Sequence, residues 1–372
     1  MQSIRKAKNL KGKTVLLRAD FNVPIVSGKI LDTNRIEKAL PTINFLRKKG
    51  AKIILLSHSD SEKDKASLLP VSKFLNRKFK VRFINESMPK SLVLSPGEIV
   101  LLENIRREKG EKANDESFAK KLASFADIYV NEAFPVSHRE HASVVSVSKY
   151  LPSFVGLQFE EEIKNLKKVL TGPRKPFLSI IAGAKFETKI PLIEKFLEKA
   201  DFVFVGGALA NNFLKERGFR IGKSLFEKGI DISKYLNDKK IILPEDLLVL
   251  RSGKIVSCFI ENVLPNDIIV DIGPKTVKIL SLKIKSSKTV VWNGPLGKYE
   301  IKGAEVGTKK VLSALASNKG CFSVIGGGDI TAVATNAIKK KLSFVSTGGG
   351  ATLEYLSKGT LPGIEAIEKS GK

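Results

Sequence analysis

The 372-residue chain has few of the residues that mark several classes of protein. Its two cysteines, Cys258 and Cys321, are too few for a disulfide framework and too far apart for a metal-ligand motif. No uncharged apolar run approaches the roughly 18 residues that a membrane span needs. The basic opening MQSIRKAKNLKGK lacks the apolar stretch of a signal peptide, so secretion is not expected. We therefore expect a reduced, cytoplasmic protein whose length suggests about two domains.

Acidic residues are also scarce, because 38 Asp and Glu face 64 Lys and Arg, which gives a net charge of +26. Such an excess of basic residues raises the question of nucleic acid as a partner. The lysines are scattered along the chain, however, and no basic stretch alternates with aromatic residues as in single-strand binders. We do not expect nucleic-acid binding, and read the excess as a Lys-rich surface that attracts anionic metabolites.

Arginine is rare beside lysine, and its positions are informative. Nine of the thirteen arginines precede residue 140, among them Arg18, Arg35, Arg106 and Arg139. Arginine recognises phosphate and carboxylate groups through two parallel hydrogen bonds, which lysine cannot make. Some arginines, such as Arg47, are expected only to cover helix surfaces. The others suggest an anion site in the first half of the chain.

Apolar runs typical of strands alternate with amphipathic segments of helical period along the whole chain. The expected strands are 14–20, 51–58, 98–104 and 128–134 in the first half, and 177–184, 202–207, 268–273, 289–294, 321–329 and 343–350 in the second. Helices are expected at Arg35 to Lys49 and at Asp115 to Ala126, the latter capped by Asn114. This alternation predicts an α/β fold with two parallel sheets covered on both faces, and a domain boundary near residue 171.

Most expected strands end in polar residues or in glycines. Asp20, Asn22 and His58 follow strands of the first half, whereas Gly-rich turns follow strands of the second half. Ligands of open α/β sheets bind beyond the carboxyl ends of the strands. We therefore expect a small acidic substrate on the first domain and a nucleotide on the second.

Three glycine sets, 206–207, 326–328 and 348–350, each follow an expected strand and precede a helical pattern. Glycine lets backbone N–H groups approach a phosphate, although any one set could be only a tight turn. Asp329 after the second set could bind Mg²⁺ or simply cap a helix. Lys185 and Lys189 are expected one turn apart on a helix, facing phosphates or solvent. The absence of G-x-G-x-x-G argues against a nicotinamide dehydrogenase.

These motifs together resemble one known family. In chain order the sequence reads RADFNVP, TNRIEKALPTI, LLENIR, SHREHAS, AGAKFETKI, VGGALANNFL, DIGPKT, VVWNGPLGKYE, GGGD, STGGGATLEYL and LPGIEAI, which resembles phosphoglycerate kinase over essentially the whole chain. The resemblance implies two Rossmann-like, three-layer α/β/α domains joined by a helix. It implies a monomeric, hinge-bending enzyme that transfers a phosphoryl group reversibly from 1,3-bisphosphoglycerate to ADP with Mg²⁺, giving 3-phosphoglycerate and ATP.

The resemblance also implies domain boundaries and site residues. Residues 1–157, joined by 362–372, would bind phosphoglycerate, 158–170 would form the connecting helix, and 171–361 would bind the nucleotide. The implied substrate ligands are Asp20, Asn22, Arg35, His58, Arg106 and Arg139. The implied nucleotide ligands are Lys189, Gly206, Gly207, Gly273, Asn293, Glu300, Gly327, Gly328, Asp329 and Gly350. Arg35 and Lys185 would act on the migrating phosphoryl group, and Asp329 would bind the metal.

The sequence departs from the family pattern in three places. The family's S-H-L-G-R-P is Ser57 to Glu62 here, SHSDSE, so a substrate-side arginine is missing and two acids are gained. The family's F-G-T-A-H-R is FPVSHR at 134–139, and its hydroxyl after G-G-G-D is Ile330 with Thr331 next. These departures motivate an alternative, a divergent phosphoglycerate-kinase-like nucleotide-binding protein with weak or altered activity.

Overall fold

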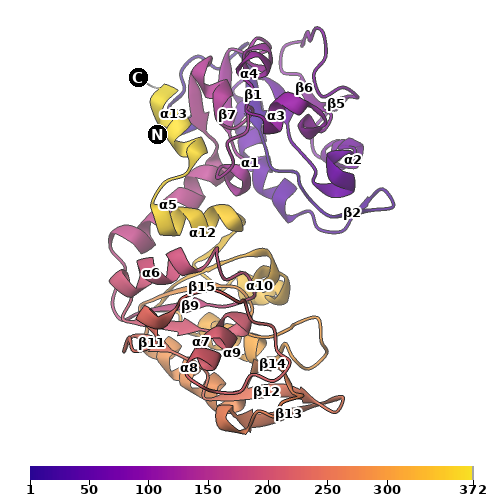
Figure 1. Cartoon of the computed structure of the whole chain (residues 1–372). Helices are drawn as coiled ribbons and strands as arrows, with labels where there is room; N and C mark the ends of the chain where they lie inside the picture. The colour runs from indigo at the N-terminus through magenta and orange to yellow at the C-terminus, as the bar shows by residue number, and fades with distance from the viewer. Residues whose placement is uncertain (371–372) are drawn as a thin grey trace. The chain divides into compact units, whose positions relative to one another are not determined.

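The computed structural model describes residues 1–370, without the side chains of residues 62 and 63. It comprises two compact units, one formed by Met1–Lys164 with Thr360–Lys372 and the other by Asn165–Gly359 (Figure 1). Helix α5, Leu157–Thr171, contains the division between them. The last two residues of the segment predicted over 362–372 lie outside the described residues. Within the described residues, no helix is long and apolar enough to cross a bilayer.

The first unit is built on a six-stranded sheet in the order β5-β6-β4-β1-β7-β8. Its strands, all paired in parallel, are β1 (Thr14–Arg18), β4 (Lys52–Leu56), β5 (Val81–Ile84), β6 (Ile99–Leu102), β7 (Ile128–Asn131) and β8 (Ser153–Val155). The unit also contains the short hairpin β2 (Ile25–Val26) and β3 (Lys29–Ile30), and the helices α1 (Asn34–Lys48), α2 (Leu69–Leu75), α3 (Lys109–Lys112), α4 (Glu116–Ala123) and α13 (Pro362–Ser370). Helix α4 is capped by Asp115, which accepts a hydrogen bond from Phe118 N at 2.7 Å, and not by Asn114 as predicted.

Both faces of this sheet are buried, because successive residues of a strand point to opposite faces. Val15 and Leu17 of β1 pack into one core with residues of α1 and α2. Leu16 of the same strand packs into a second core with residues of α4. The near-continuous apolar strands in the sequence thus correspond to a central sheet between two layers of helices.

The start of α5 rests on a buried carboxylate. Glu132, directly after β7, accepts hydrogen bonds from the N–H groups of Gln158 and Phe159, each at 3.1 Å, and from the hydroxyl of Thr42. A helix begins with unpaired N–H groups, and a carboxylate there satisfies them and favours the helix dipole. Gly156 leaves the space, since a Cβ at this position would lie 2.1 Å from Glu132 Oε2.

Replacing Glu132 with glutamine is expected to change how stability depends on pH. Burial raises the pKa of Glu132 from 4.5 to about 7, although its hydrogen bonds oppose the shift. Because the pKa of Glu132 is higher in the folded than in the unfolded chain, its protonated form stabilises the fold fully below the unfolded pKa of 4.5. This contribution to the free energy of unfolding, about 3 kcal/mol, is lost as pH rises through 7. Denaturant titrations at pH 5 and 7.5 should show Glu132→Gln gaining stability relative to wild type at the higher pH. Exposed Glu116→Gln is the control, and wild-type-like pH dependence of Glu132→Gln would contradict this account.

The second unit contains another six-stranded parallel sheet, ordered β11-β10-β9-β15-β16-β17. Its strands are β9 (Phe177–Ile181), β10 (Phe202–Val205), β11 (Ile241–Ile242), β15 (Thr289–Asn293), β16 (Phe322–Gly326) and β17 (Phe344–Ser346). Its helices are α6 (Ile190–Lys199), α7 (Gly207–Glu216), α8 (Pro274–Ser286), α9 (Val306–Ser317), α10 (Gly328–Val333), α11 (Asn336–Lys339) and α12 (Gly350–Lys358). Leu280 of α8 and Val311 of α9 share a core with Trp292 of the sheet, whereas Phe196 of α6 contacts Phe177 edge-on, with ring centroids 5.5 Å apart. The predicted fold class, two parallel-sheet α/β units, is confirmed.

A third sheet differs from the sequence-based prediction. β14 (Ile268–Ile272), expected among the parallel strands, lies instead in an antiparallel sheet with β12 (Asp246–Arg251) and β13 (Lys254–Phe259). The sequence analysis missed β12 and β13. Strand β13 is partly exposed along its length, so it lacks the continuous apolar run by which the buried parallel strands were recognised.

Candidate active site

Charged and polar side chains gather beyond the carboxyl ends of β1 and β4 in the first unit. Asp20 and Asn22 follow β1, and Arg35 reaches them from the first turn of α1. Arg35 Nη1 lies 3.0 Å from Asp20 Oδ2 and donates to the carbonyl oxygen of Asn22 at 3.2 Å. Asp20 Oδ1 in turn accepts from the N–H of Asn22 at 3.1 Å. Three of the predicted substrate ligands are therefore joined into one network.

His58 lies within the same group of arginines. It is fully buried after β4, and Arg18 Nη2 lies 3.3 Å from its Nδ1. Burial holds the pKa of His58 well below its usual 6.5, and the nearby positive charges of Arg18, Arg106, Arg139 and Arg35 lower it further. The imidazole is therefore neutral at pH 7. Among the described residues, its Nε2 has no hydrogen-bond partner.

Arg106, which follows β6 in the 3₁₀ helix Ile105–Arg107, has a side chain only 1% exposed. Burial lowers its pKa to about 10, with further contributions from Arg139 and Arg18. Its Nε and Nη2 find no hydrogen-bond partner within the described part of the chain. A buried cation with unpaired N–H groups is destabilising unless an anion accepts those hydrogen bonds. The geometry therefore fits a carboxylate or phosphate ligand.

Arg18 contacts His58 from the end of β1 and helps to hold the substrate-site residues in place. The sequence analysis noted this arginine but did not assign it to the site. Arg18 is fully buried, donates from Nε to Ser143 Oγ at 2.8 Å, and lies 3.8 Å from Glu111 Oε1. Glu111 is also fully buried and accepts from the N–H and the hydroxyl of Ser143 at 2.9 and 2.6 Å. A charged residue ending an otherwise apolar strand, TVLLR, was the signal that could have identified Arg18.

The second unit places several of its predicted residues where β9 and β15 adjoin. From β9 the next strands in the sequence, β10 and β11, are added on one side of the sheet, whereas β15, β16 and β17 are added on the other. Doubly wound sheets bind ligands at such a switch in strand order. Lys189 Nζ donates to the carbonyl oxygen of Ala182, after β9, and to Asn293 Oδ1, at the end of β15, the latter at 2.9 Å. Burial lowers the pKa of Lys189 to about 8; the charge of Asp329 raises it and that of Lys185 lowers it. Lys185, Lys189, Asn293 and Asp329 thus belong to one neighbourhood.

The helix predicted to carry Lys185 and Lys189 side by side is not present. Residues 184–189 form bends and turns, and α6 begins only at Ile190. Lys185 is exposed, whereas Lys189 is buried and points inward. The four-residue spacing resembled a helical turn, but the short GAKFETK segment is a loop that precedes the helix. Lys185 is therefore the more accessible of the two to a ligand.

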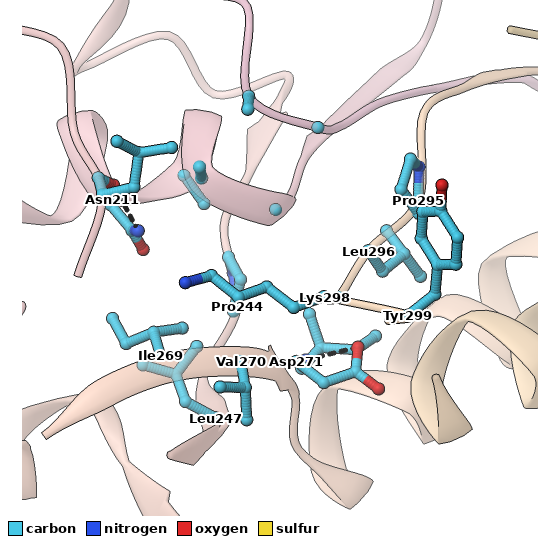
Figure 2. A pocket seen from close by; sticks show the side chains of 18 of the residues that line it. Asn211, Pro244, Leu247, Ile269, Val270, Asp271, Pro295, Leu296, Lys298 and Tyr299 are labelled. Carbon is cyan, nitrogen blue, oxygen red and sulfur yellow. Dashed lines mark hydrogen bonds between the residues drawn. The ribbon is translucent and has the colours of Figure 1, made fainter. Parts of the chain in front are cut away.

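A mainly apolar pocket lies beside this neighbourhood. Figure 2 shows Leu247, Ile269 and Leu296 around it, with the polar Lys298 and Asp271 among them. Of the predicted nucleotide ligands, Gly207, Glu300 and Asp329 line it, whereas the others do not. An apolar pocket with a few polar groups suits a planar base with a polar sugar and phosphate attached. Sequence reasoning missed the contribution of β12 and β14 because it did not recognise their antiparallel sheet.

The predicted glycines occupy different environments. Gly207 has φ +60°, and a Cβ there would lie 2.5 Å from Gly183 N, so only glycine permits this turn at the start of α7. At Gly273 a Cβ would meet the Asp246 carboxyl at 2.3 Å, so close packing requires this glycine. The remaining predicted glycines lie at chain reversals and helix starts: Gly206 precedes α7, Gly327 precedes α10, Gly328 begins it, and Gly350 begins α12.

The donor set for a metal is small. Among the described residues, no group of three or more His, Cys, Asp or Glu side chains could hold a metal ion. Asp329, in the first turn of α10, is exposed, and its Oδ1 accepts from the Tyr299 hydroxyl at 3.3 Å. One carboxylate is a typical protein contribution to Mg²⁺ that is otherwise bound by nucleotide phosphates and water. The site therefore fits a nucleotide-bound Mg²⁺ and not a metal cage made by the protein alone.

Comparisons with known proteins agree with this geometry. The family model described as phosphoglycerate kinase matches residues 4–359. The chain belongs to the phosphoglycerate kinase family. Phosphoglycerate kinases of Dictyoglomus turgidum and Thermosipho africanus are 41% and 43% identical to it, with 97% of the first and 97% of the second covered, over 97% and 98% of this chain. The structure of phosphoglycerate kinase from Coxiella burnetii is similar with a TM-score of 0.87 and 35% identity, covering 100% of this chain and 99% of that one.

Membership of the phosphoglycerate kinase family makes the chain a kinase, a phosphotransferase whose acceptor is a carboxyl group. The alternative of a divergent binding protein is not favoured. The departure at 330 is accommodated within the fold. Ile330 is buried in the core of the second unit, and the Thr331 hydroxyl donates to Gly328 O at 2.8 Å.

Proposed function

We propose that this phosphoglycerate kinase family member transfers a phosphoryl group reversibly from 1,3-bisphosphoglycerate to ADP, with Mg²⁺, to give 3-phosphoglycerate and ATP. The observation that carries the substrate assignment is the buried Arg106, whose Nε and Nη2 lack hydrogen-bond partners among the described residues. A doubly anionic small molecule would supply the acceptors that this arginine needs.

In this proposal the domain predicted over residues 1–157 and 362–372, which lies within the first unit, binds the phosphoglycerate. Arg106, Arg139 and neutral His58 bind its anionic groups, while Asp20 and Asn22 orient Arg35 and accept hydrogen bonds from the substrate hydroxyl. The ion pair between Arg35 and Asp20 supports this division, because it limits the directions in which the guanidinium can point.

The second unit binds the nucleotide. The apolar pocket lined by Leu247, Ile269 and Leu296 takes the base. Glu300 binds the ribose hydroxyls, and the backbone N–H groups at the start of α12 bind phosphate. The ammonium of Lys189 is held beside Asn293, and its positive charge stabilises the nucleotide phosphates by electrostatic attraction at short range.

The roles proposed for Arg35 and Lys185 follow from the chemistry of phosphoryl transfer. Negative charge spreads over the equatorial oxygens of the migrating group, so cations positioned on those oxygens stabilise the transition state. Arg35 serves from the substrate side and exposed Lys185 from the nucleotide side. Asp329 holds the metal, which would neutralise phosphate charge when bound. The attacking carboxylate oxygen needs no base and forms no covalent intermediate with the protein.

The donor and acceptor sites are assigned to different units, so we propose that a hinge motion near the helix of residues 158–170 brings them together. Closure would also exclude water, which otherwise competes as phosphoryl acceptor. We further propose that the enzyme acts as a monomer in the cytoplasm.

The test is a coupled assay of ATP-dependent phosphorylation of 3-phosphoglycerate with the purified protein. We expect turnover that requires both 3-phosphoglycerate and Mg²⁺ and that ceases when EDTA is added. Absence of turnover in a folded protein that still binds ATP would contradict the proposal and revive the divergent-protein alternative.

A further inference from the structure

The acidic loop that replaces the family's S-H-L-G-R-P sequence contacts two of the residues assigned to the substrate. Asn22 Nδ2 donates to Asp60 Oδ2 at 2.8 Å, and the N–H of Asp60 donates to Asn22 Oδ1 at 3.0 Å. The other carboxylate oxygen of Asp60 forms an ion pair with Arg106 Nη1. A carboxylate of the protein itself thus occupies the Asn22 side chain and Arg106 Nη1, next to the Arg106 Nε and Nη2 that the proposed function gives to an anionic substrate.

The backbone around Asp60 is held in place. Asn104 Nδ2 donates to the carbonyl oxygens of Ser59, Asp64 and Ala66, at 3.0, 2.9 and 3.1 Å. Because these bonds anchor the loop on both sides of Asp60, its carboxylate stays within reach of Arg106 while the fold is intact. The anchoring therefore fixes the backbone from which the Asp60 side chain reaches Arg106.

The two partners differ in their freedom to move. The side chain of Arg106 is 1% exposed, whereas that of Asp60 is 45% exposed. Asp60 can therefore rotate into solvent, and Arg106 cannot follow it. An exposed carboxylate also gains little from an ion pair, because water and salt screen the interaction. A ligand that offers two anionic groups to Arg106 and Arg139 can displace it.

We propose that Asp60 is an internal competitor for the phosphoglycerate site, whose carboxylate must leave Asn22 and Arg106 before substrate binds. The inference rests on the proposed substrate site. Asp60 lowers affinity for the substrate in two ways, by occupying Arg106 Nη1 and the Asn22 side chain, and by placing a negative charge beside an anionic ligand. It thereby sets the KM for 3-phosphoglycerate and selects for ligands with more than one anionic group.

The experiment compares Asp60→Asn, which removes the charge, and Asp60→Ala, which removes the contact. KM for 3-phosphoglycerate at saturating MgATP and its Kd by calorimetry are measured for each. We expect both values to fall about twofold to fivefold in both variants, with kcat within about twofold of wild type. Glu116→Gln, an exposed acid of the same unit that pairs with Lys149, controls for the change in net charge.

Arg139→Gln separates a failure of this inference from a failure of the site assignment. If Arg139→Gln raises KM but either Asp60 variant leaves KM unchanged or raises it, Asp60 does not compete, and the inference is overturned while the site stands. A rise in Asp60→Ala would instead mark Asp60 as a residue that positions Arg106. If Arg139→Gln leaves KM and Kd unchanged, the site assignment is wrong and the inference fails with it.

Discussion

Arg35→Ala should lower kcat for 3-phosphoglycerate phosphorylation by about a thousandfold, the scale associated with an arginine that stabilises the transition state of phosphoryl transfer. The expected loss is large because the interaction strengthens as charge develops on the migrating group, so its removal affects kcat more than KM. Arg35 is tied to Asp20 and to the backbone of Asn22, which preorganises its guanidinium. The measurement is the steady-state rate in the coupled assay at saturating substrates.

Arg47→Ala is the matched control, because Arg47 is an exposed arginine on the same helix, α1. Its guanidinium donates to Asn44 Oδ1 at 3.2 Å and lies over the ring of Phe79, both on the surface of the first unit. It should retain wild-type turnover. Circular dichroism and the unfolding midpoint establish that Arg35→Ala is folded. Turnover within about twofold of wild type in folded Arg35→Ala would remove Arg35 from the catalytic machinery.

Asp329→Asn should lower kcat by about a hundredfold and shift the Mg²⁺ dependence of the reaction to higher concentration. The change keeps the side chain's size while removing the negative charge that favours a hard cation. It also removes the carboxylate that raises the pKa of buried Lys189, so the ammonium there becomes less favoured. Rates are measured over a Mg²⁺ titration at fixed ATP.

Asp231→Asn serves as the comparison, since Asp231 is an exposed acid of the same unit that accepts from Ser233 N at 2.9 Å. Its Mg²⁺ titration should match that of wild type. A wild-type Mg²⁺ titration curve for Asp329→Asn would show that Asp329 does not bind the metal. Its carboxylate would then serve only to stabilise the first turn of helix α10.

The parallel sheets could be predicted because their strands are buried on both faces and therefore read as unbroken apolar runs, such as VLL before Arg18 and FLSII at 177–181. Strand β13 could not, because its exposed residues leave no such run. The two lysines of GAKFETK were placed on a helix because a four-residue spacing is the same in a helix and in a loop. Only the structure distinguishes them, by burying Lys189 and exposing Lys185.

The sequence by itself determined the family, the alternation of strands and helices, and the residue types available at the strand ends. These depend on local pattern and on motifs that can be read in order. Only the tertiary structure decided that Arg18 and Glu111 support the site, that β12 and β14 build the pocket wall, and that Asp60 lies on Arg106. Each of these features brings together residues that are distant in the chain. Their burial and the distances between their charges are set only when the strands have come together in the folded protein.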